Sequence, residues 1–215
     1  MNTFRSLRRG ALVAVVGLAA SVIPAHAQAA TLDLGACGNA VASLQRSLAS
    51  VHYPTGGTDG CYGSATKHAV LAFQLANGLQ ADGVAGSRTL RALRDPKPVV
   101  ARSRGEGAHV EVDRGRQLLL VVRDGRVTAI FAASTGKAGF TTPAGSFRVY
   151  RKVVDGWSNQ YQAPMPYASY FVRGVAVHAG KIPGYPASHG CVRVPAAFAA
   201  TLYRRMPSGS LVLVY

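Results

Sequence analysis

The spacing of the hydrophobic residues changes near residue 95, and this change restricts the chain to two dissimilar domains. Between residues 32 and 94, apolar residues recur every three or four positions, as at Leu44 and Leu48, which is typical of amphipathic helices. From His109 onward, alternating and β-branched runs dominate, which indicates strands. We therefore expect a multidomain fold in which a small helical domain precedes a mostly β domain.

Turn-forming residues divide the helical part into three segments. Pro54 to Gly57 and the Asp59-Gly60 pair interrupt the periodic pattern, and a third short helix is expected from Ser87. A stretch rich in proline, glycine and charge follows, and such a composition is typical of an interdomain linker. The predicted units are a helical domain at 32–94, the linker at 95–107 and a β domain at 108–215.

The β domain is predicted to contain several strands and one helix. Asp124-Gly125 separates two of the strands and is a strong hairpin signal. The helix is expected to begin near Pro195, because proline is favoured in a first turn. The strands are expected at residues 109–112, 117–122, 127–134, 145–152, 174–177 and 211–215.

The N-terminus has the pattern of a secretory signal peptide at residues 1–27. Arginines precede an apolar run at 11–23, and a small-x-small motif ends at Ala27, with Ala30 as a second cleavage position. The apolar run of about 13 residues is shorter than a membrane span requires. We therefore expect export to a periplasm, a cell wall or the medium. Arg8-Arg9 leaves both the general and the twin-arginine export routes open.

The charge of the chain is strongly positive, with 24 Lys and Arg against 9 Asp and Glu and a net charge of +15. An exported cationic protein is attracted to anionic polymers of the cell envelope. Nucleic acid is not an expected partner, because the arginines are scattered and no aromatic-interleaved reading motif accompanies them.

Three cysteines are an odd number, so one pair can close and one thiol remains. Cys37 and Cys61 flank the first helix, and a disulfide between them stabilises by roughly 3 to 4 kcal/mol in the chain-entropy model. A metal site that combines them with His52 or His68 lacks the close paired-cysteine spacing of such sites. We expect the disulfide, and no metal or cofactor.

The third cysteine, Cys191, lies in a segment suited to nucleophilic catalysis. A thiol needs a base or a positive neighbour to become a nucleophile. His178 ends a strand and can reach Cys191 if the intervening glycine- and proline-rich loop folds back. His189 and Arg193 add positive charge nearby, and the amides around Gly190 and Cys191 are candidate donors to an oxyanion.

Other interpretations of this segment remain open at the level of single residues. A lone cysteine is often a small buried hydrophobe, and a histidine at a strand end is often a satisfied core group. A zinc site built from His178, His189 and Cys191 needs further ligands that the flanking sequence does not offer. The clustering of these residues in an exported chain favours catalysis.

The helical segment resembles the three-helix peptidoglycan-binding module of cell-wall enzymes. The resemblance rests on Val41-x-x-Leu44-Gln45, on Asp59-Gly60-x-Tyr62-Gly63 and on the second turn Asp82-Gly83. It implies binding to peptidoglycan. The same residues also suffice to build a helical bundle without a binding role.

The segment Ser188-His189-Gly190-Cys191-Val192-Arg193 resembles the active-site signature of the YkuD-type L,D-transpeptidases. Ser134 to Lys137, Thr142 to Phe147 and the hairpin at 113–127 match the upstream pattern of that family. The resemblance spans roughly residues 108–215. It implies a β-sandwich-like domain with mixed sheets.

The resemblance also implies roles for the residues. Cys191 is the nucleophile, His178 the proton donor and acceptor, and the carbonyl of Ala179 orients that histidine. His189 and Gly190 shape the oxyanion pocket, with support from Ser188 and Arg193. The interval from His178 to Ser188 is shorter than is common in the family, and Arg193 replaces a frequent asparagine. The aromatic segment upstream is expected to line the substrate cleft with Tyr161, Met165 and Tyr167.

The implied function is a cell-wall L,D-transpeptidase that forms 3→3 peptidoglycan cross-links through a cysteine thioester, with stem peptides and glycan as partners. Two alternatives use the same chemistry, with water or the amine of an envelope protein as the acceptor. The first is an L,D-carboxypeptidase, and the second is an enzyme that anchors proteins to peptidoglycan. An alternative of another class is a peptidoglycan-binding protein without catalytic activity.

Overall fold

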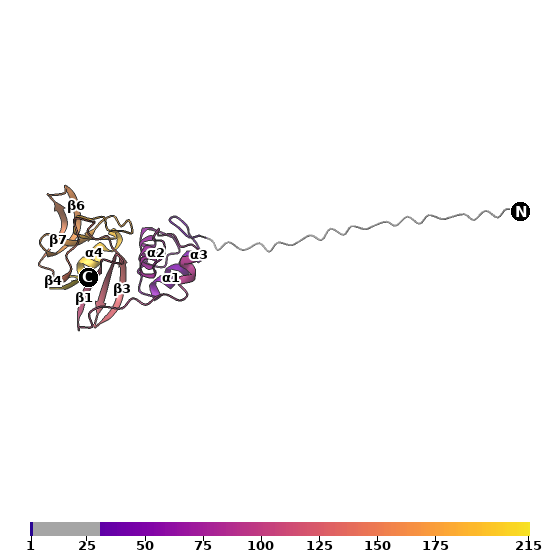
Figure 1. Ribbon diagram of the computed structural model, residues 1–215, viewed down its shortest axis with the longest axis horizontal. Coiled ribbons are helices and arrows are strands. Elements are labelled where there is room, and N and C mark those ends of the chain that lie inside the picture. The colour runs from indigo at the N-terminus through magenta and orange to yellow at the C-terminus, as the bar shows by residue number, and fades with distance from the viewer. Residues whose placement is uncertain (2–30) are drawn as a thin grey trace.

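The computed structural model describes Met1 and residues 31–215 (Figure 1). The expected signal peptide at residues 1–27 lies, apart from Met1, outside the described residues. In the described part of the chain, no helix combines the length and the apolar character that a membrane crossing requires. A helical domain lies beside a β domain, as the two-domain pattern of the sequence predicts (Figure 1).

The helical domain contains α1 (Asn39–Ser50), α2 (Ser64–Asn77) and α3 (Ser87–Ala92). A buried glutamine in each of the first two helices is hydrogen-bonded to both residues of an Asp-Gly turn. Gln45 Nε2 donates to Asp59 Oδ1 at 2.8 Å, while its Oε1 accepts from the next backbone N–H at 2.9 Å. Gln74 makes the same two bonds to the turn at Asp82, both at 2.8 Å. The domain thus repeats one helix-turn unit, which explains its paired Asp-Gly motifs.

The expected disulfide between Cys37 and Cys61 is confirmed, with the two Cα atoms 4.2 Å apart. It joins the residues that precede α1 to those that precede α2. The same two residues also form an isolated antiparallel bridge. Among the described cysteines, only Cys191 keeps a free thiol.

The β domain is a sandwich of two mixed sheets, so the expected fold class is confirmed. One sheet has the order β3-β2-β1-β9-β4 and the other β5-β6-β7-β8, with β1–β9 and β7–β8 paired in parallel. Helix α4 (Ala196–Arg205) packs against β6 and β7. The strands are β1 (Ala108–Asp113), β2 (Leu118–Arg123), β3 (Arg126–Ala132), β4 (Gly145–Arg148), β5 (Arg151–Ser158), β6 (Ala163–Val172), β7 (Val175–Ala179), β8 (Val192–Val194) and β9 (Leu211–Val214).

The strand pattern differs from the sequence prediction in two regions. The single strand predicted at 145–152 is two strands, β4 and β5, that belong to different sheets, and neither β6 nor the short strand β8 was predicted. Pro164 and Pro166 argue against a strand at the sequence level, because proline has no N–H to donate to a strand ladder. For this reason β6 was not predicted. Both prolines lie opposite residues of β5, but β6 pairs with β7 only from Ser169 onward, so at the prolines the edge of β6 that would face β7 is unpaired. Proline is tolerated at such an unpaired edge.

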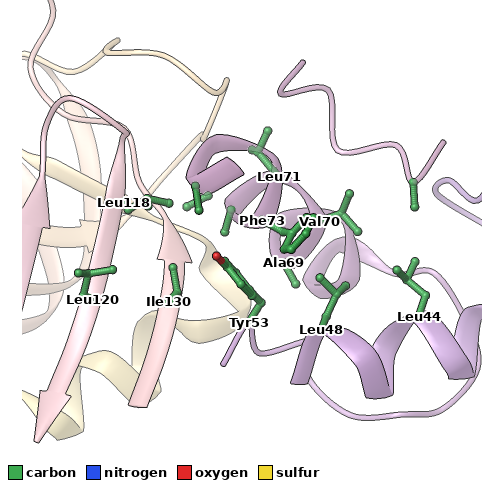
Figure 2. Close-up of a cluster of buried hydrophobic side chains, with 14 of the residues drawn as sticks. Leu44, Leu48, Tyr53, Ala69, Val70, Leu71, Phe73, Leu118, Leu120 and Ile130 are labelled. Carbon is green, nitrogen blue, oxygen red and sulfur yellow. The ribbon is translucent and has the colours of Figure 1, made fainter. Parts of the chain in front are cut away.

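The apolar run of β2 is buried on both faces. Leu119 and Val121 point into the sandwich core, whereas Leu118 and Leu120 belong to a second core that they share with the helical domain. Figure 2 shows these two leucines and Ile130 of β3 facing Tyr53 and Phe73 of the helical domain.

Hydrogen bonds reinforce the junction between the two domains. The Ile130 N–H donates to the carbonyl of His52 at 2.8 Å. The buried carboxylate of Glu111 accepts from the backbone N–H groups of Arg102 and Ser103, both at 2.8 Å. The segment 95–107 is therefore held against the β domain along part of its length.

Candidate active site

Two parallel strands bring together residues that are distant in the sequence. His178 lies on β7, and Cys191 immediately precedes β8. The register pairs Val177 with Val192 and His178 with Arg193. The glycine- and proline-rich loop between the strands thus folds back, as its composition predicted, and Cys191 comes to lie beside β7.

The segment at 134–137 fixes the loop that leads to Cys191. Ser134 and Arg193 exchange two backbone hydrogen bonds, at 2.9 and 3.0 Å, and the Lys137 N–H donates to Ser188 O at 3.0 Å. Gly136 has no room for a side chain, because an added Cβ would lie 1.8 Å from the Phe140 carbonyl oxygen. This upstream motif therefore supports the site through its backbone.

His178 is held in one orientation and one tautomer. Its Nδ1 lies 2.7 Å from the carbonyl oxygen of Ala179. A carbonyl only accepts, so Nδ1 carries the proton and Nε2 keeps its lone pair. Burial, aided by the charge of Arg193, lowers the pKa of His178 to about 4. The imidazole is therefore neutral at pH 7, and Nε2 is the nitrogen that can accept a proton.

Cys191 is also neutral at rest. Burial raises the pKa of its thiol, although the backbone of Ala176 and the charge of Arg193 act in the opposite direction. The sequence suggested that positive neighbours would lower this pKa. The structure differs because burial outweighs Arg193, so a protonated thiol and a neutral imidazole line the same cleft.

Ser188 closes the turn that carries the cysteine. Its hydroxyl donates to the Cys191 carbonyl at 2.5 Å and accepts from the Gly190 N–H at 3.1 Å. The Gly190 carbonyl accepts in turn from Thr142 Oγ1 at 2.7 Å. Both the N–H and the carbonyl of Gly190 are therefore hydrogen-bonded to protein groups. Its N–H is not available to an oxyanion in this arrangement.

The tip of the β5–β6 hairpin lies over His189. The ring of Tyr161 stacks on the imidazole at 4.3 Å between centroids and 14° between planes. Phe140 meets the same imidazole edge-on at 4.7 Å. His189 is thus packed in an aromatic cluster that covers the turn before Cys191.

A cleft of about 1210 Å³ contains Cys191 and His178. Tyr161 and Met165 line it, whereas Tyr167 is not among its lining residues and packs against Tyr203 of α4, with 6.0 Å between the ring centroids. Among the described residues, its charged lining groups are all basic: Arg173, Lys181 and Arg193. Such a lining attracts carboxylates.

Two residues of the cleft escaped the sequence analysis as parts of the site. Ser64 and His68 belong to α2 of the helical domain, yet they line the same cleft as Cys191. No local motif marks them, because they reach the cleft only through the packing of one domain on the other. In residues 31–215, no group of three or more His, Cys, Asp or Glu side chains is arranged to hold a metal ion.

The two domains match two known families. A sequence model of the YkuD L,D-transpeptidase catalytic domain matches residues 107–214, and a model of a peptidoglycan-binding domain matches residues 37–93.

Solved structures resemble the chain across both domains. An L,D-transpeptidase from Xylanimonas cellulosilytica is 41% identical, with a TM-score of 0.79 over 86% of this chain and 97% of that one. An L,D-transpeptidase from Stackebrandtia nassauensis is 30% identical, with a TM-score of 0.54 over 86% of this chain and 94% of that one. The N-acetylmuramoyl-L-alanine amidase CwlM of Mycobacterium tuberculosis is 43% identical over 56 residues, which are 26% of this chain and 14% of CwlM.

Proposed function

Because the chain belongs to the YkuD-type L,D-transpeptidase family, we propose that it joins peptidoglycan stem peptides through a thioester on Cys191. The observation that carries this proposal is the parallel pairing of β7 with β8, which brings the only free thiol of the described residues beside His178. The fixed tautomer of that histidine supports it further, since it leaves Nε2 as the ring nitrogen that can accept the thiol proton.

The first half-reaction forms the thioester. As the Cys191 sulfur attacks the carbonyl carbon of the third stem residue, Nε2 of His178 takes the thiol proton. The amide C–N bond then breaks, and His178 passes the proton to the departing amine of D-alanine. The acyl group remains on the sulfur.

The charge that develops on the carbonyl oxygen requires a donor close to the sulfur. We assign this role to the backbone N–H of Cys191, because the Gly190 N–H already donates to Ser188. His189, fixed by Tyr161 and Phe140, forms the neighbouring wall of the oxyanion pocket.

The second half-reaction transfers the acyl group. The side-chain amine of a second stem peptide attacks the thioester carbon, and the C–S bond breaks. His178 takes the proton from the attacking amine and returns it to the sulfur, which regenerates the thiol. The product is a 3→3 cross-link. The cations Arg173, Lys181 and Arg193 suit the carboxylates of both peptides.

The replacement Cys191→Ala tests the assignment of the nucleophile. We expect release of D-alanine from a tetrapeptide stem to fall to background, because no other free thiol is present among residues 31–215. Circular dichroism should show an unchanged fold, since the substitution removes a single atom. Release at the wild-type rate would overturn the proposal.

Analysis of the reaction products separates the proposal from its alternatives. Mass spectrometry of wall fragments should find a peptide dimer with a 3→3 bond. A tripeptide alone would indicate an L,D-carboxypeptidase, and a stem attached to a protein amine would indicate an anchoring enzyme. A protein that only binds peptidoglycan would form no covalent adduct on Cys191 with a carbapenem.

The proposed substrate also places the protein outside the cytoplasm. Peptidoglycan stem peptides are cross-linked beyond the cytoplasmic membrane. The disulfide between Cys37 and Cys61 supports this location, because disulfides persist in oxidising compartments. We propose that the protein works in the periplasm or the cell wall.

A further inference from the structure

The catalytic cleft has a wall that the β domain does not supply. In the sheet order, β5 and β6 lie on one side of β7, and β8 lies on the other. The hairpin residues that line the cleft, such as Tyr161 and Met165, therefore approach from one side of His178. Ser64 and His68 of α2 complete the lining from the helical domain.

The loop after β7 connects the reactive residues to this second wall. Ile182 packs against the core cluster that contains most of the helical domain's buried residues. At Gly184, an added Cβ would lie 3.2 Å from the Ala81 carbonyl and 3.5 Å from a methyl group of Leu71. The loop thus rests directly on α2 and on the turn that follows it.

The second wall is fixed in position. The helical domain shares a buried core with β2 and β3 (Figure 2), and the Ile130 N–H donates to His52 O at 2.8 Å. A wall held by a core and by backbone hydrogen bonds can bind a ligand without first becoming ordered.

The side chains of this wall are suited to a hydrogen-bonding ligand. Nδ1 of His68 lies 2.8 Å from the Ser64 carbonyl, so Nδ1 carries the proton and Nε2 is left as an acceptor. Burial lowers the pKa of His68, which keeps the imidazole neutral at pH 7. The exposed Ser64 hydroxyl donates and accepts. A peptide N–H or an amine is the natural partner of Nε2.

We propose that Ser64 and His68 of the helical domain form the subsite for the second stem peptide, the one whose amine receives the acyl group. This inference rests on the proposed transpeptidation, because a two-substrate reaction needs a donor arm and an acceptor arm. The donor arm lies under the β5–β6 hairpin. The acceptor arm, the part of the cleft that would hold the second stem peptide, runs along residues 180–183 to α2. The helical domain is then part of the active site.

Steady-state kinetics with two separate peptides tests the subsite. The donor is a tetrapeptide stem, and the acceptor is a tripeptide stem with a free side-chain amine. The double variant Ser64→Ala and His68→Ala should raise the acceptor KM about fivefold to tenfold, as expected for the loss of one or two hydrogen bonds. The donor KM should change much less.

A bulky variant and a matched control complete the test. Ser64→Trp should fill the arm and raise the acceptor KM further. Ser47→Ala is the control, because Ser47 is an exposed serine of α1 in the same domain and does not line the cleft. The control should leave both KM values unchanged.

The remaining outcomes of the kinetic experiment would contradict either the subsite or the proposed function. An unchanged acceptor KM in both Ser64 variants would overturn the subsite, and so would a rise confined to the donor KM. Failure of the wild-type protein to release D-alanine from the donor would instead refute the proposed function itself.

Discussion

At the scale of residues, the surroundings of Cys191 and His178 disfavour charge on both groups. Burial raises the pKa of the thiol and lowers that of the imidazole to about 4. A thiolate paired with an imidazolium would require the opposite order of these two pKa values. In the proposed mechanism the proton therefore moves only when a substrate is attacked, and a thiol that stays protonated at rest is less open to oxidation.

The pH dependence of alkylation tests this resting state. A raised thiol pKa predicts that the rate at which iodoacetamide modifies Cys191 climbs steadily from pH 6 to pH 9. The disulfide-bonded Cys37 and Cys61 do not compete, and Cys191→Ala provides the unlabelled control. Intact mass measured against time gives the rate. A plateau reached below pH 7 would instead indicate a preformed ion pair.

The sequence predicted part of this residue-level arrangement. The strand that ends at His178 and the glycine- and proline-rich connection after it made a return of the loop towards Cys191 plausible, whereas the strand β8 that fixes this return was not predicted. The use of the Gly190 N–H by Ser188 could not be foreseen, because it depends on a positive φ of 117° at Gly190 and on the closing of one turn. The direction of the thiol pKa depends on burial, which is a property of the packed domain.

At the scale of elements, the site depends on a segment that holds no reacting group. Residues 134–137 connect the loop before Cys191 to the strand β3 through backbone hydrogen bonds. The hairpin of β5 and β6 covers the site from the other side, and the sequence concealed β6 because its prolines resemble strand breakers. An element can thus be well formed where only one of its edges is paired.

The replacement Gly136→Ala tests the supporting segment. An added Cβ would lie 1.8 Å from the Phe140 carbonyl, and backbone cannot yield as a flexible side chain can. We expect a loss of unfolding free energy of roughly 1 to 3 kcal/mol and a fall in D-alanine release of at least tenfold. Gly63→Ala is the control, because nothing lies within 4 Å of its Cβ position. Equal stability and activity in both variants would show that the segment is not needed.

At the scale of the whole molecule, the two domains are joined by a shared buried core. Leu118, Leu120 and Ile130 of the β domain share a core with the helices, and Glu111 fixes the linker. The hydrophobic period of the sequence predicted a helical part followed by a mostly β part, yet it did not reveal that the two share a core. The clue was the run at 118–122, which is too uniformly apolar for a strand with one face in water.

Thermal or chemical unfolding of the full chain tests this coupling. Ile130 is 3% exposed and lies between the domains, so Ile130→Ala should lower the free energy of unfolding by about 2 to 5 kcal/mol. Both domains should still unfold in one transition, because each buries part of its apolar surface only while the other is folded. The matched control, Val154→Ala, changes a side chain that is 46% exposed on β5 and should have little effect. Two separate transitions, with the transition of the helical domain unaffected by Ile130→Ala, would show that the domains fold independently. The cleft wall formed by Ser64 and His68 could then not hold an acceptor peptide at a fixed position relative to Cys191.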